Sequence, residues 1–120
     1  MTLIGYLTRT HFAEAAIEDA LPEEVGPLPR ALALIDDEPA SATVCARVQE
    51  SLDQTTISLT RVGQATSPEN ATARILEALS DIQTDTLIAV GGAVAIGHAR
   101  LAAEHALRRG ERLSLIAVPA

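Results

Sequence analysis

The stretch Thr86-Leu-Ile-Ala-Val-Gly-Gly-Ala-Val-Ala-Ile-Gly-His-Ala-Arg100 decides the fold of this 120-residue chain. It begins with a short apolar run, Leu87 to Val90, which is typical of a strand buried on both faces of a parallel sheet. Gly91 and Gly92 follow at once, and an alanine-rich segment with helical spacing comes next. Backbone N–H groups at such a helix start, together with the helix dipole, favour an anion such as phosphate. The alternative is a tight turn that needs glycine only for its backbone angles.

Composition and charge limit the class of protein. Hydrophobic residues make up 48% and charged residues 21%, as in a globular protein, and the length suits one domain with a single core. The net charge of −7 argues against nucleic acid and anionic membranes as partners. No apolar run is long enough to span a bilayer and no signal peptide is visible, so we expect a cytoplasmic protein. The single cysteine, Cys45, fits a reducing compartment and is expected to be buried on the apolar face of a helix.

The chain divides into an N-terminal arm, residues 1–29, and a regular region, residues 30–120. The arm is expected to hold a short edge strand within Met1 to Thr8, an amphipathic helix from His11 to Leu21 and a proline-rich loop. In the regular region, apolar strands alternate with helices of about ten or more residues. The strands are expected at 31–35, 55–59, 87–90 and 113–118, and the helices at about 39–52, 68–82 and 93–109.

This alternation predicts the fold class. Strand–helix–strand units with right-handed crossovers give a parallel sheet that is covered by helices on both faces. We therefore predict a Rossmann-like, doubly wound α/β fold in a single domain, with Leu87 to Val90 as an inner strand.

Three segments follow predicted strands at the edge where ligands bind in such sheets. They are Asp36-Asp37, Arg61 to Thr66, and Gly91-Gly92. An acid at a strand end, near a glycine phosphate turn, commonly bonds a ribose hydroxyl and repels a 2′-phosphate. Asp36 would then give a preference for NAD over NADP. The alternative is that the two aspartates only start the next turn, where Asp is common.

The histidines do not have the spacing of a metal site. His98 and His105 lie seven residues apart on one predicted helix, which separates them by roughly 10 Å, too far to share one ion. His11 is isolated in the N-terminal arm. We therefore predict solvated or packed histidines and no metal in this chain. No Ser or Thr has the surroundings of a recognisable nucleophile, so no catalytic residue is assigned.

The segment Val90 to Arg100, followed by Leu115-Ile-Ala-Val-Pro119, resembles the iron-containing alcohol dehydrogenase family, and most of all its maleylacetate reductase branch. That family carries G-G-G-S-x-x-(D or G)-x-x-K in its cofactor domain and then a strand that ends in P-T-T. Gly91, Gly92, Gly97 and Pro119 stand at matching positions, and Gly97 favours the reductase branch.

The resemblance extends over about Arg30 to Ala120. Asp36 falls where many members carry an acid facing the adenosine ribose, and Ser67 falls where the helix before the glycine strand usually starts. In its order of strands and helices, too, this region resembles the family.

The sequence also departs from the family motif. Ala93 replaces the third glycine and Val94 the serine, so a phosphate-facing hydroxyl is lost and the turn is bulkier. Arg100 keeps the charge of the family's lysine but not its shape. Ala120 stands where threonine would begin the nicotinamide-side motif. The 120 residues do not include the helical domain that holds the family's metal ligands.

The resemblance implies an NAD(P)-binding domain of an iron-containing alcohol dehydrogenase or maleylacetate reductase-like oxidoreductase, inactive alone and dependent on a partner chain with the helical domain. It implies NAD(H) or NADP(H) as a weakly bound or lost ligand. The residues implied to bind it are Asp36, Gly91, Gly92, Ala93, Val94, Gly97 and Pro119.

Two other functions remain open. One is a catalytically inactive relative that acts as a binding or assembly subunit, which the altered Gly-Gly-Ala-Val turn favours. The other is a cyclase-type relative such as 3-dehydroquinate synthase, which shares a similar glycine turn. A sheet domain without its larger partner leaves apolar surface uncovered, so we expect a homo-oligomer such as a dimer, or a complex with a partner protein chain.

Overall fold

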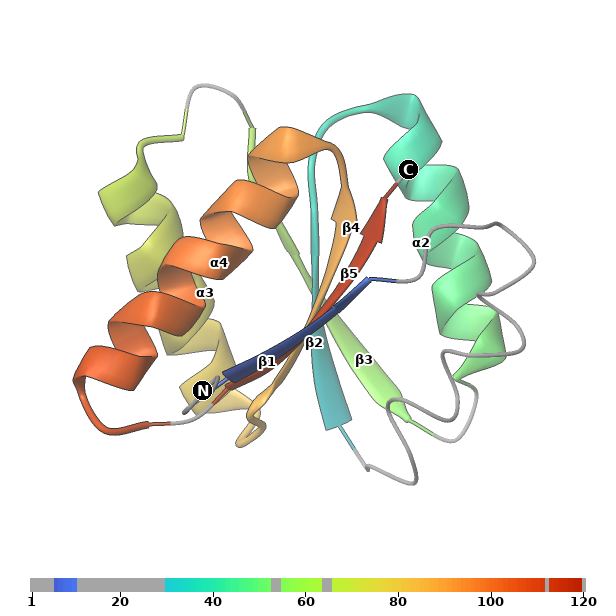
Figure 1. The fold of residues 1–120 in the computed structure, drawn as a ribbon. Coiled ribbons are helices and arrows are strands. Elements are labelled where there is room, and N and C mark those ends of the chain that lie inside the picture. The colour runs from blue at the N-terminus through green and yellow to red at the C-terminus, as the bar shows by residue number, and fades with distance from the viewer. Residues whose placement is uncertain (1–5, 11–29, 53–54, 64–65, 112, 120) are drawn as a thin grey trace.

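The computed structural model describes residues 6–10, 30–52, 55–63, 66–111 and 113–119. They form a five-stranded sheet in the order β1-β5-β4-β2-β3, with helices on both faces (Figure 1). The strands are β1 (Tyr6–Thr10), β2 (Arg30–Ile35), β3 (Thr56–Arg61), β4 (Thr86–Gly91) and β5 (Leu113–Pro119). The helices are α2 (Pro39–Ser51), α3 (Pro68–Asp81) and α4 (Ala93–Arg108).

Every pair of neighbouring strands is parallel, which confirms the predicted Rossmann-like α/β fold. β4 lies in the middle of the sheet between β5 and β2, and all six of its residues are buried. The apolar run Leu87 to Val90 is therefore the inner strand that its composition predicts. β1 adds an edge strand beside β5. The helix predicted from His11 to Leu21 and the proline-rich loop lie outside the described residues.

The two faces of the sheet carry separate hydrophobic clusters. Leu87 and Ala89 of β4 belong to the cluster formed with α3 and α4, whereas Ile88 and Val90 belong to the cluster formed with α2. This alternation follows from the two-residue repeat of a strand. Cys45 is buried in the α2 cluster, as predicted, and burial raises the pKa of its thiol although Arg61 acts in the opposite direction.

Local sequence signals fix where the helices begin and end. The Ser67 hydroxyl accepts a hydrogen bond from the Asn70 N–H (3.2 Å), Pro68 is the first residue of α3, and Glu69 lies in its first turn. α4 ends at Arg108, and Gly110 follows with a φ of 79°, a conformation that suits glycine. Among the described helices, none is both long and apolar enough to cross a membrane.

Candidate functional site

The candidate site lies between β2 and β4, where the direction of the crossover connections across the sheet reverses. β2 and β4 are neighbours, but α2, which follows β2, and α4, which follows β4, lie on opposite faces (Figure 1). Ligands of doubly wound sheets bind at such a switch point, beyond the carboxyl ends of the strands. The structure brings two of the predicted segments together there, because the N–H of Gly92 donates a hydrogen bond to Asp36 Oδ2 (2.9 Å).

Asp36 is held by hydrogen bonds from within the protein. Asp36 is only 5% exposed, and its Oδ1 accepts hydrogen bonds from the Ser41 hydroxyl and from the backbone N–H of Glu38 (3.1 Å). Burial alone would raise the pKa of this carboxyl, but the hydrogen bonds from Ser41, Gly92 and Glu38 outweigh it and hold the pKa below its ordinary value. Asp36 is therefore a carboxylate at neutral pH. These contacts favour a structural role for Asp36 in the turn. Contact between Asp36 and a ribose stays a prediction.

Gly91 and Gly92 differ in what they require. Gly91 has a φ of 146°, and a Cβ at this position would overlap Asp36 Oδ2 and lie 3.1 Å from Ser41 Oγ. Glycine is therefore needed at position 91 both for the backbone and for the close approach of Asp36. A Cβ on Gly92 would have only Asp36 Oδ2 nearby, at 3.9 Å, which is ordinary van der Waals contact. The need for glycine at position 91 is thus explained within the chain.

The start of α4 leaves backbone donors available. No side chain caps this helix, and the N–H of Gly92 is already bonded to Asp36. The next two amides, of Ala93 and Val94, have no hydrogen-bond acceptor among the described residues. N–H groups in a first helical turn have no partner inside the helix, and the helix dipole adds a partial positive charge. This end of α4 is therefore suited to an anionic oxygen.

A pocket of about 590 Å³ lies beside this helix start. It separates the first turns of α4 from the segment that leads into α3. Its described lining has no Asp, Glu, Lys or Arg; the residues are Thr66, Pro68, Ala93, Val94, Gly97, His98 and Leu101. Three of the predicted ligand-binding residues, Ala93, Val94 and Gly97, are thus brought together on one wall. We call this cavity the α4 pocket.

Gly97 leaves open space on that wall. A Cβ built on Gly97 would meet no atom within 4 Å, so packing does not require glycine there. Glycine inside a helix costs roughly 0.5–1 kcal/mol relative to alanine. Room for a ligand beside the helix is one physical reason for this choice.

His98 is the residue of the pocket whose role the sequence did not indicate. It is 9% exposed, and its Nδ1 is buried without a hydrogen-bond partner. The sequence predicts a packed or solvated histidine, and in the structure His98 is packed. Its place on the pocket wall follows from its spacing, because it comes four residues after Val94 and so lies on the same face of the helix.

The remaining predicted residues reach the same edge of the sheet. Pro119 ends β5 and is the register partner of Gly91. After β3, the N–H of Val62 bonds to the Ile35 carbonyl (2.9 Å), and the N–H of Gly63 donates to Thr66 Oγ1 (3.2 Å). The β2, β3 and β4 ends therefore meet as the topology predicts.

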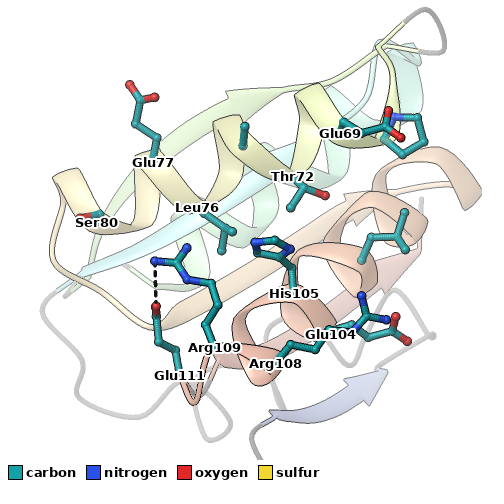
Figure 2. Close-up of a pocket in the computed structure, with 13 residues that line it drawn as sticks. Glu69, Thr72, Leu76, Glu77, Ser80, Glu104, His105, Arg108, Arg109 and Glu111 are labelled. Atoms are coloured by element: carbon teal, nitrogen blue, oxygen red, sulfur yellow. Dashed lines mark ion pairs between the residues drawn. The ribbon is translucent and has the colours of Figure 1, made fainter.

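A second, larger groove of about 740 Å³ runs between α3 and α4. Figure 2 shows His105 and the Arg109–Glu111 ion pair (3.4 Å) there, with Glu69 and Glu104 toward other parts of the rim. His105 is thus separate from the lining of the α4 pocket. Within the described ranges, no cluster of three or more His, Cys, Asp or Glu residues could hold a metal ion.

Comparison with family models gives no match for this chain, and comparison with curated proteins gives none either. The resemblance to the iron-containing alcohol dehydrogenase family therefore stays a prediction that rests on the residues quoted for it.

Proposed function

We propose that this chain is a nucleotide-binding domain, similar to the NAD(P)-binding domain of an iron-containing alcohol dehydrogenase, that binds its ligand's phosphate at the start of α4. One observation carries the proposal: the amides of Ala93 and Val94 have no hydrogen-bond acceptor among the described residues, and both residues line a pocket whose described lining has no Asp, Glu, Lys or Arg side chain. Phosphate groups bind at helix starts of this kind because the N–H groups and the dipole both favour negative charge.

The charge of Asp36 determines on which side of the helix start a phosphate lies. Its carboxylate already accepts the Gly92 N–H and would repel a second anion in the crevice between β2 and β4. Among the described residues that line the α4 pocket, none has an acidic side chain. We therefore place the phosphate in the pocket, against Ala93 and Val94.

Two features make the proposed binding weak. The net charge of −7 acts against an anionic ligand at low ionic strength. Val94 also lacks the hydroxyl that serine would offer to a phosphate oxygen, and one hydrogen bond to a charged group is worth about 1.5–3 kcal/mol, or roughly ten-fold or more in affinity.

Under this proposal, hydride transfer needs residues from a second protein chain. A hydride transfer requires a carbonyl that is held and polarised against the nicotinamide, which the family achieves with a metal in its helical domain. Leu59 on the edge strand β3 and Leu101 on α4 are 44% and 43% exposed, the large hydrophobic side chains left open to solvent in the part of the chain described here. We propose that a partner chain, or a second copy, covers apolar surface of this kind.

A second function competes with this one. In a catalytically inactive relative, the fold would serve as a binding or assembly subunit and the nucleotide would be lost. The occupation of the Gly92 N–H by Asp36, together with the missing hydroxyl at Val94, favours this alternative.

Calorimetric titration with NADH, NADPH and ADP-ribose, in enough salt to screen the net negative charge, separates the two functions. We expect weak binding to the natural chain, and a gain of about ten-fold when Ala93→Gly and Val94→Ser restore the family motif. Val44→Ser is the matched control, because it makes the same change at a half-buried valine of α2 on the other face of the sheet. Absence of binding in both the natural chain and the restored variant would favour the assembly subunit.

A further inference from the structure

The strand β3 lies at one edge of the sheet, beside β2 alone (Figure 1). Along a strand, the N–H and C=O groups of successive residues point alternately to its two sides. The N–H of Val62 donates to the Ile35 carbonyl (2.9 Å), so the even-numbered residues of β3 direct their backbone groups at β2. The N–H and C=O groups of the odd-numbered residues, Ile57, Leu59 and Arg61, therefore point away from the sheet.

The two ends of this outer edge are bonded within the chain, and its middle is open. Arg74 on α3 donates a hydrogen bond to the carbonyl of the last residue of β3 (2.9 Å), and the Thr55 N–H, just before the strand, donates to the Leu52 carbonyl (3.0 Å). Between these ends, the outward groups of Ile57 and Leu59 have no hydrogen-bond partner in the part of the chain that the structure describes. Such open backbone groups at a sheet edge are a template for another strand.

The side chains of β3 lack the features that usually protect an edge strand. The strand has no proline, lysine or acidic residue, and it pairs with β2 residue by residue without a bulge. Leu59 is 44% exposed, whereas Ile57, on the same face, is half-buried against the α2 cluster. An exposed leucine and open backbone groups therefore occur at the same place.

Two copies of this edge are complementary to each other. In an antiparallel pair, opposite residues whose N–H and C=O groups face each other exchange both hydrogen bonds. A two-fold axis at Ser58 places Ile57 of one copy opposite Leu59 of the other, and the reverse, so every open backbone group of the segment is paired. Leu59 then packs beside Ile57 of the second copy, and the two Ser58 side chains meet on the other face.

We propose that β3 pairs with β3 of a second copy of this chain, antiparallel about Ser58, so that the two sheets join into one across a dimer. The inference goes beyond the proposed function, because no residue of β3 lines the α4 pocket. One strand pair is a small interface, and the net charge of −7 on each copy opposes association. The dimer is therefore weak, and salt strengthens it by screening that charge.

Analytical ultracentrifugation of the full chain over a range of concentrations tests the contact. We expect a monomer–dimer equilibrium whose Kd rises by about ten-fold or more in Leu59→Lys, because the change puts a charge into two symmetry-related pairs. Leu101→Lys is the matched control, since Leu101 on α4 is 43% exposed and its replacement should leave the Kd unchanged. A monomer at concentrations up to about 1 mM would overturn the inference, and so would a Kd no higher in Leu59→Lys than in Leu101→Lys.

A cysteine cross-link tests the register and covers the case in which Leu59→Lys does not fold. The two Ser58 residues form a non-hydrogen-bonded pair with Cα atoms about 4.5 Å apart, within the range of a disulfide. Ser58→Cys should therefore give a disulfide-linked dimer under a mild oxidant, whereas Thr60→Cys, on the same face but opposite Thr56 of the second copy, should not. Cys45 is buried and common to both variants. No cross-link at Ser58→Cys, or an equal yield in the two variants, would overturn the inference.

Discussion

Replacing Asp36 by asparagine tests the contact that joins the two halves of the site. In the structure its carboxylate accepts hydrogen bonds from Ser41, from the Glu38 N–H and from the Gly92 N–H. Asparagine has one oxygen and one NH₂ group, so in either orientation a backbone N–H faces the amide NH₂. The variant therefore loses at least one hydrogen bond to a charged group and leaves a buried donor unpaired. We expect the free energy of unfolding to fall by about 2–4 kcal/mol.

Urea denaturation followed by circular dichroism measures this loss, since the chain has no tryptophan. With a slope of about 2 kcal/mol per molar urea, the midpoint should fall by about 1–2 M. Asp37→Asn is the control, because this neighbouring carboxylate is exposed and the change should stay within about 0.5 kcal/mol.

The stability difference between wild type and Asp36→Asn should also depend on pH. The folded pKa of Asp36 lies below its ordinary value of 3.8, so the carboxylate contributes stability above that pH. The contribution is lost as pH falls through the folded pKa. The difference between wild type and Asp36→Asn should be nearly constant from pH 7 to 4 and shrink below pH 3.8. Equal midpoints for Asp36→Asn and Asp37→Asn, or a difference that grows on acidification, would refute the reasoning.

Three further predictions follow from the glycines and the histidines. Gly91→Ala should lower the free energy of unfolding by about 2–4 kcal/mol, because residue 91 has a positive φ and the added methyl group would overlap Asp36. Gly92→Ala should lower it by about 1 kcal/mol or less, because a Cβ there has room. Equal losses for the two variants in urea denaturation would contradict this. Gly97→Ala should raise stability by about 0.5–1 kcal/mol yet weaken ADP-ribose binding in calorimetry, since its methyl group enters open space at the pocket wall; unchanged affinity would argue against the pocket. The purified chain should hold no stoichiometric iron or zinc by elemental analysis and should oxidise no alcohol; metal with turnover would contradict the expectation drawn from the histidine spacing.

Much of the fold could be predicted because it depends on local sequence. The apolar run Leu87 to Val90 indicates a strand buried on both faces, and the order Ser67-Pro68-Glu69 marks the start of α3. Both signals act within one element, so neighbouring residues are enough to read them.

The candidate site could be predicted only in part, because its contacts join distant residues. Gly92 and Asp36 are 56 positions apart, and only the neighbouring placement of β2 and β4 brings the carboxylate onto the Gly92 N–H. The sequence indicates that Asp36 follows a strand but not that its oxygens are already bonded. Likewise, the burial of His98 Nδ1 depends on how α4 packs, although the four-residue spacing from Val94 could have placed the side chain on the same helix face.

We propose above that the start of α4 binds a phosphate in the α4 pocket. Its most direct test is calorimetric titration of the chain with ADP-ribose, with Ala93→Gly and Val94→Ser introduced together as the comparison. We expect weak binding to the natural chain and binding about ten-fold tighter to the variant, because serine restores a hydrogen bond to phosphate. Equal affinity in the two proteins, or no binding in either, would contradict it.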